Sequence, residues 1–369
     1  QYQTTMAIYD LNETTPYIAV HPGEVIKDEL KERGMTQKML ASMTGVPASV
    51  VNEIIRGKRD LNASYAIAFS KILEIPAESL MRLQNVYDLD VARINDKEVE
   101  EISSENELME YNKAFDVKLV LKRLGKSFIS YSDTLGYLKS AFSLPSSAQL
   151  QLETAGLFRK SSKTGLDRRM IMTWKMLAEY SARQFSLDAE FDKSESDELV
   201  NMLRCAFHEN RDTFHRVASI LASHGIIFCI VEKVDRASVD GYSFMCGDNP
   251  AIIVTKRYDR IDNFAFTVMH ELGHVLLHFS GNDAAYLHLS DEENSSVAEQ
   301  EADAFAQNSL IPDAIWKSAP HVSMNISDIQ SEYSKWAKRN CLNKWIVLGR
   351  VSYETGIYKF RQDSLRHIC

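Results

Sequence analysis

The sequence predicts a mainly helical chain of the α+β class, built from a five-helix domain, a helical middle region and an α+β domain with a small sheet. Short helical runs separated by capping residues fill the first ninety residues. An acidic run follows, and a long apolar helix appears late in the chain, after the strand-like run Pro250–Thr255. These changes of pattern predict a first domain over residues 16–95, a linker and middle region over 96–223, and a third domain over 224–369.

Five short helices are predicted between Pro22 and Asp90. Thr36 is a suitable cap for the second helix, and Gly45 is a suitable terminator. The third helix starts at Ala48, immediately after Pro47. Two short helices joined by a tight glycine turn are typical of a helix-turn-helix, in which the second helix of the pair enters the DNA major groove.

The third predicted helix would therefore read the bases of DNA. Its outward positions can reach base edges, and polar or basic residues around it can reach phosphates. The predicted base-reading residues are Ala48, Ser49, Asn52 and Glu53, and the predicted phosphate contacts are Gln37, Arg56, Lys58 and Arg59. Charge does not decide the matter, because residues 21–88 contain nine basic and nine acidic residues. A five-helix bundle that contacts only proteins remains open.

Three segments of this domain resemble the Xre-type helix-turn-helix, and more closely the HigA-type antitoxins: HPGEVIKDEL, TQKMLASMTGVPASVVNEIIRGKRDLNASYAIAFSKIL and LMRLQNVYDLD. The tryptophan that usually precedes the final LQ is replaced by Leu80 or Met81. The resemblance implies a repressor that binds operator DNA in the major groove and controls an operon encoding a HigB-like toxin. A homodimer is expected, since such operators commonly have two half-sites.

The middle region begins with seven acidic residues between Asp96 and Glu110. This run predicts a solvated helix or linker. We therefore place the first domain boundary at its start.

The run Val268–His278, VMHELGHVLLH, contains the pattern H-E-x-x-H. On a helix, His270 and His274 lie on one face, about 6 Å apart, so both imidazoles can bind one Zn²⁺. Glu271 is one step round the helix, where it can act as the general base of metal-assisted amide hydrolysis. Asn263, preceded by Asp262, is the expected cap of this helix.

A catalytic zinc needs a third protein ligand. The helical run Val297–Leu310 offers Glu299, with Asp303 on the same face to hold a ligand histidine by its other ring nitrogen. Glu301 ranks second, because it points about 200° away from Glu299. His278 lies about 12 Å along the helix from His270 and is expected to play a supporting role. His288 stays open as a ligand.

The segments HELGHVLLH and EQEADAFAQNSLIP resemble the ImmA/IrrE family of bacterial zinc metallopeptidases, which are gluzincin-like in fold. The resemblance extends to GYSFMCGDNPAIIVTKRYDRIDNFAFTVM and WIVLGRVSYETG. It implies that His270, His274 and Glu299 are metal ligands and that Glu271 is the base. The basic residues usual before the active-site helix are partly replaced by Asp262, Asn263 and Ala265.

Substrate contacts are less defined than the metal site. Pro250–Thr255 could be an edge strand that holds an extended peptide, or equally a buried core strand. Tyr258, Tyr286 and His288 are the candidates for stabilising an oxyanion, and nothing in the sequence decides between them.

Composition indicates a cytoplasmic protein with no membrane partner. No apolar run reaches membrane length, and five cysteines without a C-x-x-C pair or a signal peptide indicate reduced thiols. The net charge of -9 argues against non-specific coating of nucleic acid but permits sequence-specific binding.

Two functions follow from these observations. In the first, a DNA-binding antitoxin carries an active peptidase that cleaves a repressor or partner under stress. In the second, the peptidase fold is an idle sensor or binding scaffold.

Overall fold

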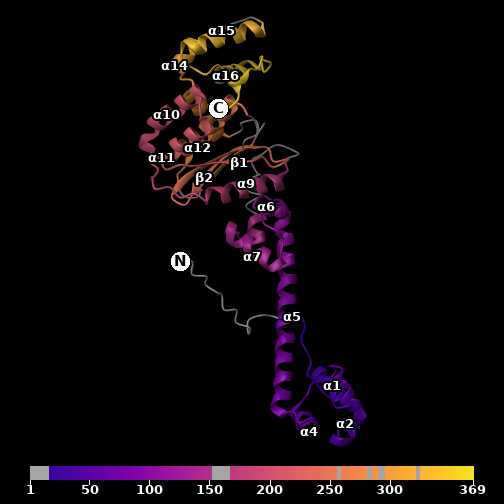
Figure 1. The fold of residues 1–369 in the computed structure, drawn as a ribbon. Coiled ribbons are helices and arrows are strands. Elements are labelled where there is room, and N and C mark those ends of the chain that lie inside the picture. The colour runs from indigo at the N-terminus through magenta and orange to yellow at the C-terminus, as the bar shows by residue number, and fades with distance from the viewer. Residues whose placement is uncertain (1–15, 152–166, 256–258, 281–284, 290–295, 321–324) are drawn as a thin grey trace, which may run out of the picture. The chain divides into compact units, whose positions relative to one another are not determined.

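A computed structural model describes residues 16–151, 167–255, 259–280, 285–289, 296–320 and 325–369. The chain divides into two compact units, one of residues 1–106 and 130–132 and the other of residues 107–129 and 133–369. The helical and sheet content confirms the predicted α+β class (Figure 1). Among the helices of the described residues, none has the length and apolar character needed to cross a membrane.

The first unit contains the five predicted helices. They are α1 (Pro22–Glu32), α2 (Gln37–Thr44), α3 (Ala48–Ile55), α4 (Ala63–Leu73) and the beginning of α5 (Ala77–Ala114). The Thr36 hydroxyl accepts a hydrogen bond from the Met39 amide, and Gly45 ends α2 in the left-handed conformation with φ 74°. The caps predicted from the sequence are thus confirmed.

A single hydrophobic core joins these helices, with Ile26, Leu40, Val51, Ile54 and Phe69 completely buried. Gln84 of α5 is buried and fixes α5 to the loop after α3, because its side-chain oxygen accepts the Leu61 amide at 2.8 Å. The acidic run Asp96–Glu110 lies within α5 and is therefore helical.

The second unit places a four-stranded sheet among helices. The strands are β1 (Ile227–Val231), β2 (Val239–Cys246), β3 (Asn249–Thr255) and β4 (Ala285–Leu289), in the order β1-β3-β2-β4. β1 is parallel to β3, and the other two pairings are antiparallel. β3 is a central strand and β4 is an edge strand, so the buried interpretation of Pro250–Thr255 is correct and the edge interpretation is wrong.

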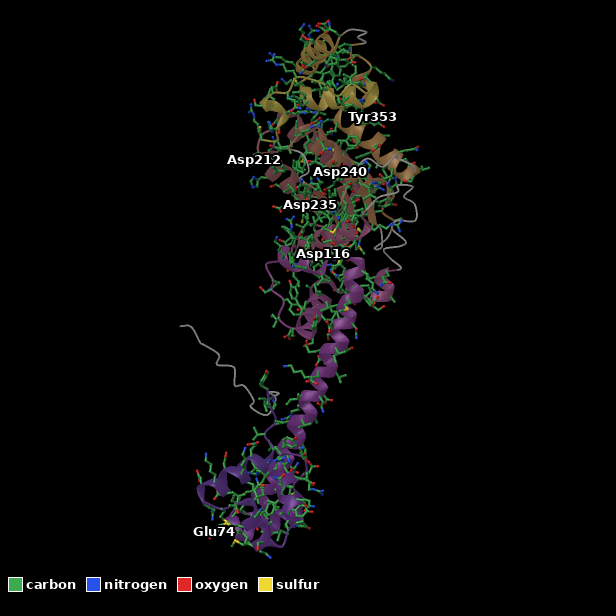
Figure 2. All side chains as sticks on the ribbon, turned by 90° about the vertical axis from the view of Figure 1, so that its right-hand side faces the viewer. Glu74, Asp116, Asp212, Asp235, Asp240 and Tyr353 are labelled. Carbon is green, nitrogen blue, oxygen red and sulfur yellow. The ribbon has the colours of Figure 1, made fainter. Side chains whose placement is uncertain are left out.

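The helices of the second unit surround this sheet. Besides the last residues of α5 they are α6 (Val117–Arg123), α7 (Tyr131–Phe142), α9 (Arg168–Ala182), α10 (Ser196–Glu209), α11 (Thr213–Ser223), α12 (Ile261–His278), α13 (Val297–Leu310), α14 (Asp313–Trp316), α15 (Ile326–Arg339) and α16 (Lys344–Thr355), with short 3₁₀ turns η1 (Lys193–Glu195) and η2 (Ser364–Arg366). The side chains fill the space between these elements (Figure 2).

Helix α12 is the centre of this unit. It packs against α13, α16, β2 and β3 and buries Phe264, Val268, Leu272 and Val275. The helix begins at Ile261 with Arg260 as its cap residue, so the predicted cap at Asn263 is wrong. The Asp262 carboxylate before it is engaged in ion pairs with Arg260 and Arg366 and does not cap the helix.

Candidate metal centre and nucleic-acid interface

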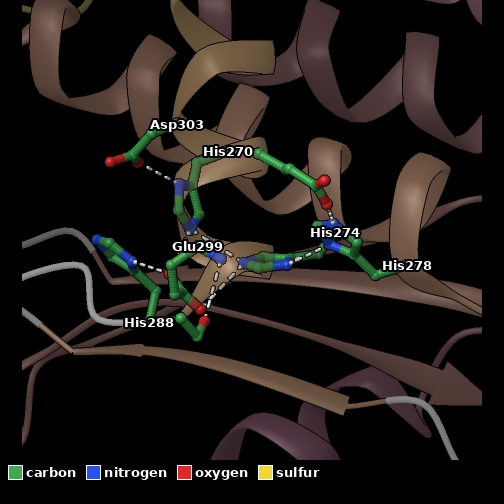
Figure 3. A network of polar contacts seen from close by, with 8 residues as sticks. His270, His274, His278, His288, Glu299 and Asp303 are labelled. Atoms are coloured by element: carbon green, nitrogen blue, oxygen red, sulfur yellow. Dashed lines mark hydrogen bonds and ion pairs between the residues drawn. The ribbon is translucent and has the colours of Figure 1, made fainter.

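Three side chains from α12 and α13 converge on one point (Figure 3). His270 and His274 are completely buried, with their Nε2 atoms 3.1 Å apart. The Glu299 carboxylate approaches both, at 3.1 Å from His270 Nε2 and 3.3 Å from His274 Nε2. These are the three residues of the described chain whose ligand atoms form a group able to hold a metal ion.

The spacing of these atoms fits a tetrahedral zinc site. Ligand atoms bound to zinc at 2.0–2.1 Å lie about 3.3 Å from one another at the corners of a tetrahedron. The three measured separations agree with that value. The donor set of two imidazoles and one carboxylate, with room for a fourth ligand, is also the type found in catalytic zinc sites.

Electrostatics favour a positive charge at this point. Burial alone lowers the pKa of His270, but hydrogen bonds with Asp303 and Glu299 raise it to about 10. Burial likewise opposes ionisation of Glu299, yet its contacts with His270, His274 and His288 hold its pKa far below the usual range. The centre therefore attracts either a proton or a metal cation.

Both histidines are held by their outer ring nitrogens. Asp303 Oδ1 lies 2.8 Å from His270 Nδ1, which is the contact expected of a residue that orients a ligand. On the other side, His278 Nδ1 lies 3.0 Å from His274 Nδ1, and His278 Nε2 lies 3.0 Å from Glu301.

This second contact was missed from the sequence. Glu301 had been considered only as a rival ligand, whereas it is the partner of His278. The i+4 spacing of His274 and His278 was the signal that could have revealed the pair.

Strand β4 brings two further side chains to the centre. The Tyr286 ring stacks on His274 with centroids 4.4 Å apart, and His288 Nδ1 lies 3.4 Å from Glu299 Oε2. Both residues are thus adjacent to the candidate ligands. Tyr258, the third oxyanion candidate, lies outside the described residues.

Glu271 is completely buried, and neither of its carboxylate oxygens has a hydrogen-bond partner among the described residues. Burial raises its pKa, although the neighbouring imidazoles act in the opposite direction. A buried carboxylate without a partner is costly in a fold that has no use for it. Glu271 therefore has the properties of a general base that waits for a substrate proton.

Two glycines provide the space that this arrangement needs. A β-carbon at Gly241 of β2 would lie 2.2 Å from Glu271 Oε1. A β-carbon at Gly273 of α12 would lie 3.1 Å from the Phe305 ring and 3.2 Å from Ala302 Cα. Gly273 had no explanation in the sequence, and the close approach of α13 supplies it.

The predicted DNA-reading surface lies on α3 and the residues around it. Ala48 and Ser49 are exposed, while Asn52 and Glu53 are half-buried. Asn52 Nδ2 donates a hydrogen bond to Gln37 Oε1 at 2.9 Å, and Arg59 Nε donates to Glu53 Oε2 at 2.6 Å. Two pairs of the predicted contacts are thus positioned by each other.

Two of the predicted phosphate contacts are unpaired cations. Arg56 and Lys58 are exposed, and within the described part of the chain neither has a carboxylate partner. Their guanidinium and ammonium groups are available to an anionic ligand.

Comparison with known families decides what these two regions are. Residues 26–80 match the helix-turn-helix family, and residues 223–339 match the IrrE N-terminal-like domain of the peptidase M78 family. The chain joins a helix-turn-helix domain to an IrrE-like peptidase domain. The IrrE-like domain contains α12 and α13, and therefore all the residues of the candidate metal centre.

Individual relatives are similar over a small part of the chain. Virulence-associated protein I of Dichelobacter nodosus is 36% identical over 75 residues, which are 20% of this chain and 69% of that protein. The antitoxin HigA of Pseudomonas aeruginosa, solved with the higBA promoter, is 34% identical, with 22% of this chain and 91% of that chain covered and a TM-score of 0.21. An antidote protein of the HigA family from Coxiella burnetii is 28% identical, with 22% and 88% covered and a TM-score of 0.21.

Proposed function

We propose that the chain is a sequence-specific DNA-binding repressor whose IrrE-like domain is a zinc-dependent endopeptidase. The observation that carries the enzymatic part is the convergence of His270, His274 and Glu299 beside the partnerless carboxylate of Glu271. A stable fold has no need of a buried carboxylate without a hydrogen bond, whereas hydrolysis needs a base.

Each residue has a distinct role in this proposal. Zinc, when bound by His270, His274 and Glu299, supplies Lewis-acid polarisation of the scissile carbonyl. Asp303 fixes the ring of His270, and His278 fixes the ring of His274. Glu271 accepts the proton of the attacking water and passes it to the leaving amine, so its carboxylate must be ionised before the reaction and free of other partners.

The metal content of the purified chain tests this centre first. We expect about one zinc per chain, and loss of zinc in both His270→Ala and Glu299→Ala, because each removes one of three protein ligands. Metal content is measured by mass spectrometry after dialysis. Glu301→Ala is the matched control on α13, since Glu301 contacts His278 rather than the centre, and it should retain zinc. Full zinc occupancy in Glu299→Ala would refute the assigned ligand set.

The proposal for DNA binding rests on the helix-turn-helix family and on the surface of α3. The polar side chains of this helix would enter the major groove, and Arg56, Lys58 and Arg59 would contact phosphates. Asn52 is the strongest candidate for base reading, because an amide can form two hydrogen bonds with adenine and Gln37 already fixes its orientation.

Two substitutions separate these roles. Asn52→Ala should weaken binding to a selected operator by about 1–3 kcal/mol, with loss of base preference. Lys58→Ala should weaken binding to all sequences alike and reduce the salt dependence. Both effects are measured by fluorescence anisotropy on operator and random DNA over a range of salt concentrations. An equal loss on both DNAs for Asn52→Ala would refute its role.

The regulatory setting follows from the resemblance to HigA-type antitoxins. We propose that the chain binds its operator as a homodimer, represses an operon that encodes a HigB-like toxin, and cleaves a repressor or partner protein under stress. The cytoplasm is the compartment in which these partners would meet.

A further inference from the structure

A cavity of about 310 Å³ lies beside the candidate metal centre, between α12, α13, α16 and β4. Its wall includes Asp303, which contacts His270, and His288, which contacts Glu299. The cavity therefore begins about one side-chain length from the point where the three ligands converge. Tyr353 of α16, labelled in Figure 2, lies at its exposed margin.

Most of the cavity surface is apolar. The apolar side chains come from every element that forms the wall: Phe266, Leu289, Leu310, Ile311 and Ile346. Ligand pockets in proteins start at about 300 Å³, so this cavity suits one large side chain rather than a long peptide.

The charged groups in the wall are already neutralised. Asp262 is paired with Arg260 and Arg366, and Arg350 is paired with Asp313 and Glu354. A charged ligand would have to give up its water without gaining a free counter-charge, which is unfavourable. The cavity therefore selects for a neutral, apolar group.

Two polar side chains in the wall have unused hydrogen-bonding capacity. Asn263 and Gln307 line the cavity, and no hydrogen bond of either side-chain amide occurs within the described chain. Each amide has both a donor and an acceptor, which is the complement of a peptide group. An apolar cavity bordered by two free amides is suited to a side chain that enters together with its backbone.

We propose that this cavity binds a bulky apolar side chain, such as that of leucine, methionine or phenylalanine, from the substrate residue next to the scissile bond. The proposal rests on the proposed peptidase function and names its substrate class: an extended peptide with a large apolar residue at the cleavage site. Burial of such a side chain contributes about 1.5–3 kcal/mol.

Metal-chelating peptide hydroxamates test the cavity without requiring hydrolysis. Three probes that differ only in the side chain beside the hydroxamate, with isobutyl, methyl or carboxymethyl, are titrated into the zinc-loaded full chain by calorimetry. The isobutyl probe should bind roughly tenfold more tightly than the methyl probe or better, and the carboxymethyl probe should bind no more tightly than methyl.

Gln307→Phe fills the cavity without touching a ligand of the metal. It should remove the isobutyl preference and leave the affinity of the methyl probe unchanged. Ala304→Phe is the matched control, because Ala304 is exposed on the same helix and is not part of the cavity wall. This control should retain the preference.

The possible results separate the cavity from the peptidase function. Equal binding of isobutyl and methyl probes, or a preference that survives Gln307→Phe, would overturn the cavity assignment alone. Failure of every probe to bind the zinc-loaded chain would overturn the metal centre together with the cavity. Isobutyl binding that persists after removal of zinc would show a separate small-molecule site and would also overturn the proposal.

Discussion

Replacing Glu271 with glutamine is expected to reduce peptide hydrolysis by about 10²–10⁴-fold, the usual contribution of a general base. Glutamine has nearly the same shape but cannot accept the proton. Because neither oxygen of Glu271 has a hydrogen-bond partner among the described residues, the substitution breaks no recorded contact. It also removes the cost of burying a charge, so the variant should fold at least as stably as the parent chain.

The measurement compares initial rates on a peptide library with apolar residues at varied positions, using parent and variant at equal zinc occupancy. Zinc content should be unchanged, since Glu271 is not one of the converging ligands. Unchanged hydrolysis in a zinc-loaded Glu271→Gln chain would refute the general-base role. If regulation and partner turnover in cells also stayed unchanged, the peptidase proposal would give way to an idle scaffold.

Gly241→Ala is expected to produce the second large effect, through a residue that has no chemistry of its own. The added β-carbon would lie 2.2 Å from Glu271 Oε1, far inside van der Waals contact. Either the carboxylate or strand β2 must move. We expect a loss of about 1–3 kcal/mol in the free energy of unfolding, together with a fall in hydrolysis approaching that of Glu271→Gln.

A second substitution shows whether the clash with Glu271 is the cause. In a Glu271→Asp background the carboxylate is one methylene shorter, so Gly241→Ala should cost much less stability there than in the parent. Gly136→Ala is the control, because Gly136 lies in helix α7 with open space around it and should gain stability slightly. Thermal unfolding of the four variants provides the comparison. An equal cost of Gly241→Ala in both backgrounds would exclude the proposed contact.

Local patterns predicted much of this fold. Thr36 and Gly45 bound α2 as expected, since caps and left-handed glycines depend on a few neighbouring residues. The spacing of His270 and His274 on one helical face is equally local. Glu299 and Asp303 could be nominated because they share a face of their own helix, one turn apart.

Features that depend on distant parts of the chain could not be predicted in this way. Asn263 has the chemistry of a cap, but the helix starts earlier because Asp262 pairs with Arg366, 104 residues away. The place of Pro250–Thr255 in the sheet depends on β4, which follows α12 in the chain. The contact between Gly241 and Glu271 joins a strand to a helix, and no periodicity in either segment reports it.

The close approach of α13 to Gly273 has a thermodynamic consequence for metal exchange. Ala302 Cα lies 3.2 Å from where a β-carbon of Gly273 would be, so the two helices that bear the converging side chains are held together by their backbones. The apolar core around α12, and not a bound ion, keeps them in register. Little conformational entropy is then lost when a cation enters, and a chelator should empty the site while the domain stays folded, unlike zinc fingers, which unfold without metal.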